Sequence, residues 1–432
     1  MPGLLTQVDP DGLLEYSVVF TDRSLNHMSK TFQGVMNDIS DTLKEVYNAQ
    51  AVVVVPGGGT YGMESVARQF ASGKKCLVIR NGWFSFRWSQ ILEMGGISSD
   101  VTVLKARSTE PGPQAAMAPA PIEEVIARIQ SERPDIVFAP HVETSSGMLL
   151  PDDYVRAVAD AVHSVGGLFV LDCIASGTLW LDMQACGVDI LISAPQKGWS
   201  ASPCSALVML GEKALQGIVE TTSTSFACDL RKWLEIMQAY ENGGHAYHAT
   251  MPTDALKSFH DTMKETQAYG FDKVRQEQLE LGQEVRRMLS SRGFKSVAAE
   301  GFQAPGVVVC YTDDAAILAL ALMLIRLACL FILIDAIQVT ASFCLRAFKD
   351  TRFPFVVMCI TYWMITLPLG YWLGVVTAED AATGTVNFWK AMILGIAITA
   401  ILVGIRVWQT LRKPLPPQHG SEAAPHDRLL TD

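Results

Sequence analysis

The chain reads VVVVPGGGTYGME over residues 52–64, where a β-branched run leads into three glycines and then into a helical pattern. A β-branched run of this length is typical of a buried strand. Backbone N–H groups at the start of the following helix, with the Thr60 hydroxyl beside them, form a cradle that suits a phosphate group. The stretch therefore predicts a strand-turn-helix unit that binds an anion.

The same alternation of strands and helices extends over the first three quarters of the chain. Short apolar runs, each followed by a loop and usually by an amphipathic segment, occupy residues 51–55, 76–79, 136–138, 168–171 and 190–192. This order predicts an α/β fold with a mostly parallel sheet and helices on both faces.

The glycines also allow a different interpretation. Gly57, Gly59 and Gly62 satisfy the G-x-G-x-x-G pattern of a dinucleotide-binding unit. That unit needs an acidic residue at the end of the next strand, but the strand at 76–79 is followed by Arg80. Because Arg80 would suit a 2′-phosphate, the dinucleotide interpretation stays open at this point, as does a turn that serves only packing.

Two later strands end in residues that carry chemistry. The run LFVLD ends at Asp172, and DILISAPQK ends at Lys197. Alone, Asp172 would most often cap a helix, and Lys197 would most often lie on the surface. A carboxylate against the ring nitrogen of pyridoxal phosphate improves that cofactor as an electron sink, and a loop lysine can form a Schiff base with its aldehyde and move a proton. Together with the glycine turn, they predict a pyridoxal-phosphate site.

The composition excludes other classes of protein. The net charge of −10 comes without a basic stretch interleaved with aromatic residues, which argues against nucleic-acid binding. Nine cysteines without a C-x-x-C pair predict reduced thiols rather than a zinc site or a disulfide framework. The first residues do not resemble a secretory signal, so residues 1–310 are expected in the cytoplasm.

The composition changes near Asp314. Three long apolar segments follow, at residues 315–345, 353–376 and 388–408. Each is long enough to cross the ~30 Å hydrocarbon core of a membrane. Buried core helices are the alternative, but three such segments joined by short polar links favour transmembrane helices and a lipid bilayer as partner.

The stretch at 52–252 resembles the class V pyridoxal-phosphate aminotransferases of the alanine-glyoxylate and serine-pyruvate kind, segment by segment, and the likeness covers about residues 40–312. The resemblance implies a fold-type I large domain, the cofactor pyridoxal 5′-phosphate, and transfer of an amino group from a small amino acid to a 2-oxo acid. It makes Lys197 the Schiff-base residue and proton shuttle, and Asp172 the partner of the ring nitrogen.

The resemblance also assigns the other cofactor contacts. They would be Gly58, Gly59 and Thr60 at the phosphate, Phe84 stacked on the ring, Thr144 beside the ring hydroxyl, Ile174 under the ring and Gln196 next to Lys197. Tyr247 and Thr250 would reach the phosphate bound by the neighbouring subunit, which implies a homodimer. His245 and His248 lie in the same loop and lack a third ligand, so we do not assign them to a metal.

The small domain that ends such enzymes is interrupted here. It begins near residue 277, reaches one expected strand at 306–311, and is followed by the apolar segments. The family's arginine that clamps the substrate carboxylate has no candidate in a matching context. We therefore expect cofactor binding with impaired use of amino acids.

The apolar part resembles the last three helices of a multidrug and toxin extrusion (MATE) transporter, over about residues 318–413. The likeness rests on IDAIQV at 334–339, LRAFKDTR at 345–352 and YWMITLPLGY at 362–371. By this resemblance Asp335 is a candidate cation site, since an acid at that depth is costly unless it has a function or a partner. The alternative function is thus a membrane fragment of a cation-coupled efflux antiporter with a vestigial soluble part, although three helices cannot build two lobes and a central cavity.

The loop charges conflict with a cytoplasmic enzyme. Basic residues follow the first and third segments, namely Arg346, Lys349, Arg352, Arg406, Arg412 and Lys413. The positive-inside rule puts these parts in the cytoplasm, and three crossings then put residues 1–314 outside. Either the first segment, which contains Arg326 and Asp335, does not span, or the halves were never selected to work together. We favour the second hypothesis, a fusion of two gene fragments or an assembly error.

These observations predict five parts of the chain. They are an N-terminal arm and helix at 1–50, a cofactor-binding large domain at 51–275, a truncated small domain at 276–314, three transmembrane helices at 315–413 and a polar tail at 414–432.

Overall fold

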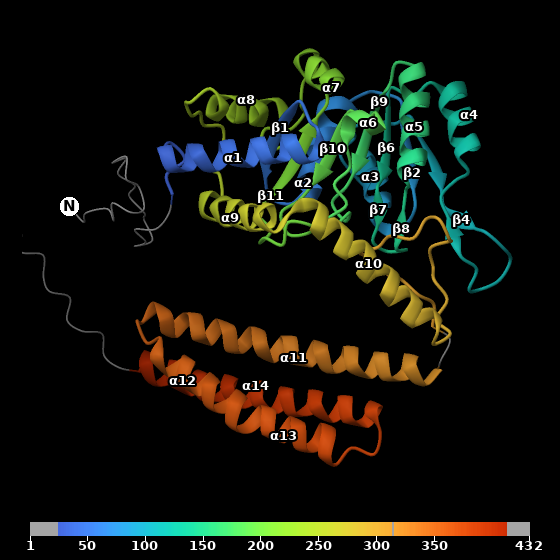
Figure 1. Ribbon diagram of the computed structural model, residues 1–432. Coiled ribbons are helices and arrows are strands. Elements are labelled where there is room, and N and C mark those ends of the chain that lie inside the picture. Colours follow the sequence, from blue (N-terminus) through green and yellow to red (C-terminus); the bar gives the residue numbers. More distant parts are fainter. Residues whose placement is uncertain (1–24, 313–314, 413–432) are drawn as a thin grey trace, which may run out of the picture. The chain divides into compact units, whose positions relative to one another are not determined.

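A computed structural model describes residues 25–312 and 315–412. The chain divides into two compact units, Met1–Tyr311 and Thr312–Asp432, which Figure 1 shows in blue to yellow and in orange to red. The first unit is α/β and the second is helical.

Within the described residues, one seven-stranded sheet organises the first unit in the order β1-β11-β10-β9-β6-β2-β3. Its strands are β1 (Ala51–Pro56), β2 (Cys76–Arg80), β3 (Val101–Lys105), β6 (Ile136–Pro140), β9 (Leu168–Asp172), β10 (Ile190–Ser193) and β11 (Ser205–Leu210). The strands from β10 to β3 are parallel, and β11 is antiparallel to both of its neighbours. The predicted mostly parallel sheet is confirmed, and each of the five predicted runs forms a strand.

Two small ladders lie beside this sheet. One pairs β4 (Arg107–Ser108) with β5 (Met117–Ala118), and the other pairs β7 (Val142–Glu143) with β8 (Met148–Leu149). The second ladder begins two residues after the carboxyl end of β6.

Helices cover both faces of the main sheet. The four valines at 52–55 are fully buried in succession, which requires cover on both sides of the strand. The covering helices are α1 (Lys30–Tyr47), α2 (Gly59–Phe70), α3 (Trp83–Met94), α4 (Ile122–Glu132), α5 (Asp152–Ser164), α6 (Met183–Cys186), α7 (Glu212–Gly217), α8 (Leu230–Glu241) and α9 (Thr253–Tyr269).

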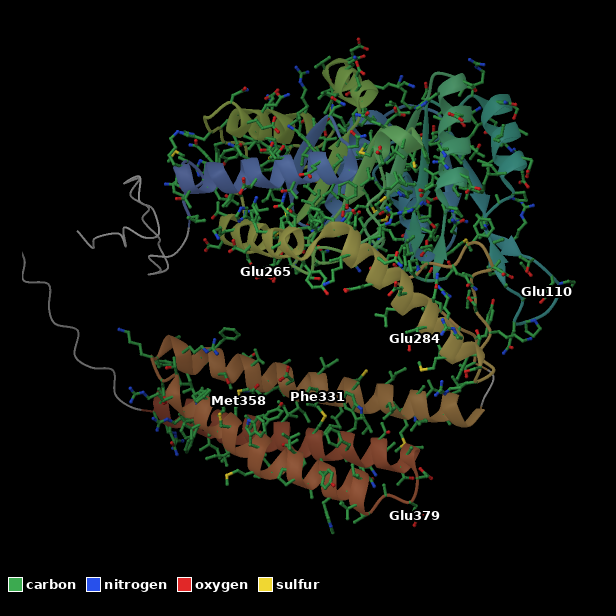
Figure 2. All side chains as sticks on the ribbon, viewed as in Figure 1. Glu110, Glu265, Glu284, Phe331, Met358 and Glu379 are labelled. Atoms are coloured by element: carbon green, nitrogen blue, oxygen red, sulfur yellow. The ribbon has the colours of Figure 1, made fainter. Side chains whose placement is uncertain are left out.

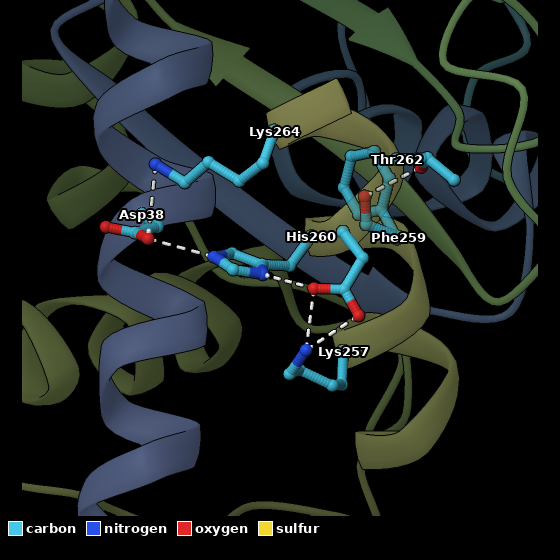
Figure 3. A network of polar contacts seen from close by, with 7 residues as sticks. Asp38, Lys257, Phe259, His260, Thr262 and Lys264 are labelled. Atoms are coloured by element: carbon cyan, nitrogen blue, oxygen red, sulfur yellow. Dashed lines mark hydrogen bonds and ion pairs between the residues drawn. The ribbon is translucent and has the colours of Figure 1, made fainter. Parts of the chain in front are cut away.

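A polar network ties α1 to α9, which are far apart in the sequence (Figure 3). His260 Nε2 lies 2.8 Å from Asp38 Oδ2, and Lys264 Nζ lies 3.2 Å from the same oxygen. On the other side of the ring, His260 Nδ1 lies 3.1 Å from Asp261 Oδ1, which Lys257 also contacts. The hydrogen bond from His260 lowers the pKa of Asp38 against the opposing effect of partial burial. The network therefore fixes the packing of the two helices through charge-assisted bonds.

The part predicted to be a truncated small domain contains most of α10 (Phe271–Ser290) and the segment after it. The strand predicted at 306–311 is wrong, because the segment makes only an isolated bridge between Cys310 and Ser296. The segment bonds to a short stretch on one side, from Val297 N to Val309 O at 2.9 Å and from Tyr311 N to Lys295 O at 2.8 Å, and no further strand follows it in the described chain. Arg286 holds this segment instead, by donating to the carbonyl oxygens of Ala304 and, at 3.0 Å, Val307.

The second unit has three apolar rods. These are α11 (Ala315–Ala347), the run formed by α12 (Arg352–Ile360) and α13 (Leu367–Tyr371) with π-helical turns at Thr361–Thr366 and Trp372–Val376, and α14 (Ala381–Leu411). By length and composition, Leu318–Ala347, Arg352–Val376 and Ala381–Leu411 could each cross a membrane. Nitrogen and oxygen atoms are sparse along them in Figure 2, where Met358 and Phe331 are labelled.

The rods pack through small and hydroxyl residues. Buried Thr361 Oγ1 lies 2.7 Å from Thr399 Oγ1 on α14. A Cβ added at Gly395 would lie 1.7 Å from Thr366 Oγ1, so only glycine allows this approach. At one end, Arg406 Nε lies 2.8 Å from Asp350 Oδ2. This mode of packing is typical of helices in membranes.

Candidate active site

The carboxyl ends of the central strands meet the start of α2 at a cavity of about 220 Å³. Most of the predicted site residues line it, namely Gly59, Thr60, Phe84, Thr144, Asp172, Ile174, Gln196 and Lys197. Met63, Arg87, Pro140, Val142 and Ala175, which the sequence reasoning did not single out, complete the lining. Residues separated by more than a hundred positions in the sequence therefore share one cavity.

The glycine turn brings backbone to the cavity. Gly57 has a φ of 124°, a conformation that side chains rarely tolerate, and α2 begins at Gly59 without a side-chain cap on its first N–H groups. A Cβ on Gly59 would lie 2.5 Å from Ile174 Cδ1, and one on Gly58 would lie 3.9 Å from Gln196 Nε2. The uncapped helix start can therefore donate to an anion.

Asp172 ends β9, between β10 and β6 in the sheet. The residue is 8% exposed, and its carboxyl accepts a hydrogen bond of 3.0 Å from the backbone N–H of Ile174. Burial raises the pKa of Asp172 to about 6, with a contribution from the charge of Glu143 and opposing ones from the Ile174 bond, Arg87 and Lys197. A buried acid of this kind favours a cationic partner.

Lys197 lies in the turn that follows β10. The turn is closed by hydrogen bonds from Ser200 N to Lys197 O at 3.1 Å and from Ala201 N to Pro195 O at 3.0 Å. A Cβ on Gly198 would lie 1.9 Å from Gly177 O, so the turn depends on glycine next to the lysine. The neighbouring Gln196 Oε1 is buried without a partner in the described residues. A buried amide oxygen of this kind calls for a donor that is not part of the polypeptide.

A buried carboxylate positions the start of α3. Glu143 accepts hydrogen bonds from the backbone N–H groups of Phe84 at 3.1 Å and Ser85 at 2.9 Å, and from the Ser145 hydroxyl at 2.7 Å. It is fully buried, and a Cβ on Gly82 would lie 2.7 Å from its Cγ. Glu143 thus fastens the turn that carries Phe84 to the loop that carries Thr144.

Arg87 lies one helical turn after Phe84. Its Nη1 donates to Thr60 Oγ1 at 2.9 Å, and its Cζ lies 5.2 Å from the centroid of the Phe84 ring. Arg87 could have been predicted from the sequence, because residues three apart on a helix share a face and Phe84 was already a predicted site residue. No sequence pattern indicated Glu143, since its role depends on contacts between distant loops.

Three predicted residues do not line the cavity. Gly58 lies beside it at the helix cap, whereas Tyr247 and Thr250 lie in an exposed loop after α8. The Tyr247 side chain is 66% exposed, and its ring centroid is 5.6 Å from that of His27. Their contribution to a neighbouring subunit stays a prediction.

The chain belongs to the aminotransferase class-V family, whose model matches residues 13–327. Among curated proteins, it is 26% identical to the L-aspartate–glyoxylate aminotransferase of Paracoccus denitrificans (strain Pd 1222), over 64% of this chain and 67% of that protein. Among solved structures, the alanine–glyoxylate aminotransferase of Nostoc sp. matches with a TM-score of 0.59 and 19% identity, over 68% of this chain and 74% of that one. That likeness confirms the fold, and the family confirms pyridoxal phosphate as the cofactor.

The apolar part matches a second family. The MatE model matches residues 302–372. The chain is also 39% identical to the multidrug resistance protein MdtK of Proteus mirabilis (strain HI4320), over 25% of this chain and 23% of that protein. Both predicted resemblances are therefore confirmed. The chain spans about two thirds of the aminotransferase relative and about a quarter of the transporter relative.

The cavity fits the cofactor of the family. The start of α2 has backbone N–H groups without a side-chain cap, Gln196 has an unpaired buried oxygen, and Asp172 is a buried acid without a hydrogen-bonded cation in the described residues. Lys197, an amine that could attach an aldehyde covalently, lines the same cavity.

Proposed function

We propose that the first unit binds pyridoxal phosphate and transfers an amino group from a small amino acid to a 2-oxo acid. The observation that carries the proposal is that Thr60, Asp172 and Lys197, from three separate segments, line one cavity. When bound, the cofactor supplies an electron sink for the bonds at the substrate's Cα. Membership of the family supports the reaction class, and the substrates follow from the names of its relatives.

Each residue has a role in this proposal. Lys197 attaches the cofactor and moves the proton, and Asp172 holds the ring nitrogen in its cationic form. The remaining contacts are Gly58, Gly59 and Thr60 with the phosphate, Phe84 and Ile174 with the two ring faces, and Thr144 and Gln196 with polar atoms of the cofactor.

The proposal includes a homodimer, in which Tyr247 and Thr250 contact the phosphate in the other subunit. The exposure of their loop is consistent with this part, because it leaves Tyr247 and Thr250 accessible to a neighbouring subunit. The proposal also places the enzyme unit in the cytoplasm, which the free cysteines of the described residues support. The interruption after Tyr311 is expected to reduce activity, because no arginine from that domain lines the cavity.

The test uses the full chain, purified in detergent and mixed with pyridoxal phosphate. We expect an absorption band that Lys197→Ala abolishes and that Lys105→Ala, a change at the end of the edge strand β3, leaves intact. Borohydride reduction should then fix the cofactor to the peptide that contains Lys197, as located by mass spectrometry. An amino donor that bleaches the band would identify the substrate. A wild-type chain without a band, or a label on another lysine, would contradict the proposal.

The transporter match favours a second candidate function, cation-coupled efflux. Asp335 of α11 is half-buried within the second unit, as an ion-binding acid would be. Dye efflux driven by a cation gradient, from vesicles that contain only this chain, would support it if Asp335→Asn abolished the efflux. Vesicles without gradient-dependent efflux would rule it out.

A further inference from the structure

We propose that Arg87 binds the phosphate group of the cofactor as the positive charge of the phosphate site. The inference rests on the proposed function and adds a binding residue to it. None of the residues assigned to the phosphate above carries a positive charge, since they are Gly58, Gly59 and Thr60 in the same subunit and Tyr247 and Thr250 in the other.

The position of Arg87 supports the inference. Its guanidinium donates to the Thr60 hydroxyl at 2.9 Å, and both side chains line the cavity together with Gly59. Thr60 lies in the first turn of α2, whose N–H groups have no side-chain cap. A guanidinium has several N–H donors, so it can bond Thr60 and an oxyanion together. Phe84, 5.2 Å from Arg87 Cζ, provides an aromatic face that orients the guanidinium.

The charges of the cavity point to the same conclusion. Its charged lining residues are Asp172, Lys197 and Arg87. Asp172 is an acid, and Lys197 is required for covalent attachment, so Arg87 is the remaining cation in the lining. Transfer of a doubly charged phosphate out of water is costly unless a cation compensates for it. Arginine suits this task because its planar fork matches two phosphate oxygens.

A competing role for Arg87 is to act on Asp172. The two charges interact, because Arg87 opposes the rise that burial causes in the pKa of Asp172. An arginine that served only Asp172 would affect the ring of the cofactor and would not distinguish a ligand with phosphate from one without it. The two roles therefore differ in a measurable way.

The experiment compares pyridoxal phosphate with pyridoxal, which lacks the phosphate. Dissociation constants of both ligands are measured by absorbance titration for the full chain and for Arg87→Met, Arg87→Lys and Arg80→Met. Arg80 is the matched control, because it also lies over an aromatic ring, at 4.7 Å from Phe86, but does not line this cavity. We expect Arg87→Met to weaken pyridoxal phosphate about 10- to 100-fold and to leave pyridoxal unchanged. Arg87→Lys should lose less, and Arg80→Met should behave as the unchanged chain.

Unchanged pyridoxal binding in Arg87→Met would also show that the variant folds. An equal loss for both ligands, or no loss for either, would overturn the inference while leaving the proposed function standing. If the unchanged chain bound neither ligand, the proposed function itself would fail, and this inference with it.

Discussion

Asp172 is a buried carboxyl whose ionisation costs more free energy than that of an exposed aspartate. Its pKa of about 6 in the fold lies above the ordinary value of 3.8, mainly because of burial. The folded chain therefore holds this proton more tightly than the unfolded chain, so ionisation of Asp172 lowers the free energy of unfolding as the pH rises from about 4 to about 6. A cationic ring nitrogen would offset that cost.

This sign leads to a prediction for ligand binding. The affinity for pyridoxal should fall by up to about tenfold per pH unit below pH 6, because Asp172 must first lose its proton. Pyridoxal is the suitable ligand because it lacks a phosphate that titrates in the same range. Asp172→Asn should bind weakly without this dependence, as measured by titration at a series of pH values. The same slope in both proteins would show that another group is responsible.

At the level of residues, the sequence predicted the side chains that carry the chemistry better than the side chains that position them. Asp172 and Lys197 were predictable because one ends an apolar run and the other lies in the loop directly after the next one, where parallel strands deliver side chains to a common edge. Glu143 was not predictable, since nothing in its neighbourhood shows that Phe84 and Ser85 will donate to it. Contacts between loops depend on the complete fold, which local patterns do not encode.

At the level of elements, the sequence predicted what local patterns determine. The five strands followed from apolar runs, but β3 and β11 were missed, and the antiparallel direction of β11 depends on the long loop after β10. The third apolar rod begins earlier than predicted, at Ala381, because Asp380 caps it by accepting from Thr383 N at 2.7 Å. The strand expected at 306–311 failed for a different reason, since the segment has the composition of a strand but pairs only at an isolated bridge to Ser296.

The approach of α14 to its neighbour gives a prediction for the helical unit. Gly395→Leu should destabilise this unit by about 1–3 kcal/mol, because the new side chain would collide with Thr366, whose Oγ1 would be 1.7 Å from the added Cβ. Gly404→Leu is the matched control on the same helix, where an added Cβ meets nothing within 4 Å. Thermal unfolding in detergent, followed by proteolysis of the helices, should separate the variants. Equal stability of the two would mean that the helices do not pack as described.

At the level of the whole molecule, the chain matches the models of two families. The aminotransferase match ends at residue 327 and the transporter match begins at residue 302, so the two overlap over residues 302–327. A segment has one ancestry, and the change of family therefore falls inside this overlap. The compact units divide in the same place, at Tyr311 and Thr312.

A change of family between residues 302 and 327 is hard to reconcile with joint selection of the halves. The first unit ends at a segment that makes a single isolated bridge, and the second matches about a quarter of its transporter relative. The basic residues around Asp350 and after α14 favour the cytoplasm, which would place the enzyme unit on the other side after three crossings. We therefore predict that the genomic region and its transcript do not cover residues 302–327 as one uninterrupted message. Sequencing both across the junction tests this prediction. A single continuous message would contradict it and would favour the alternative, in which the first apolar segment does not span the membrane.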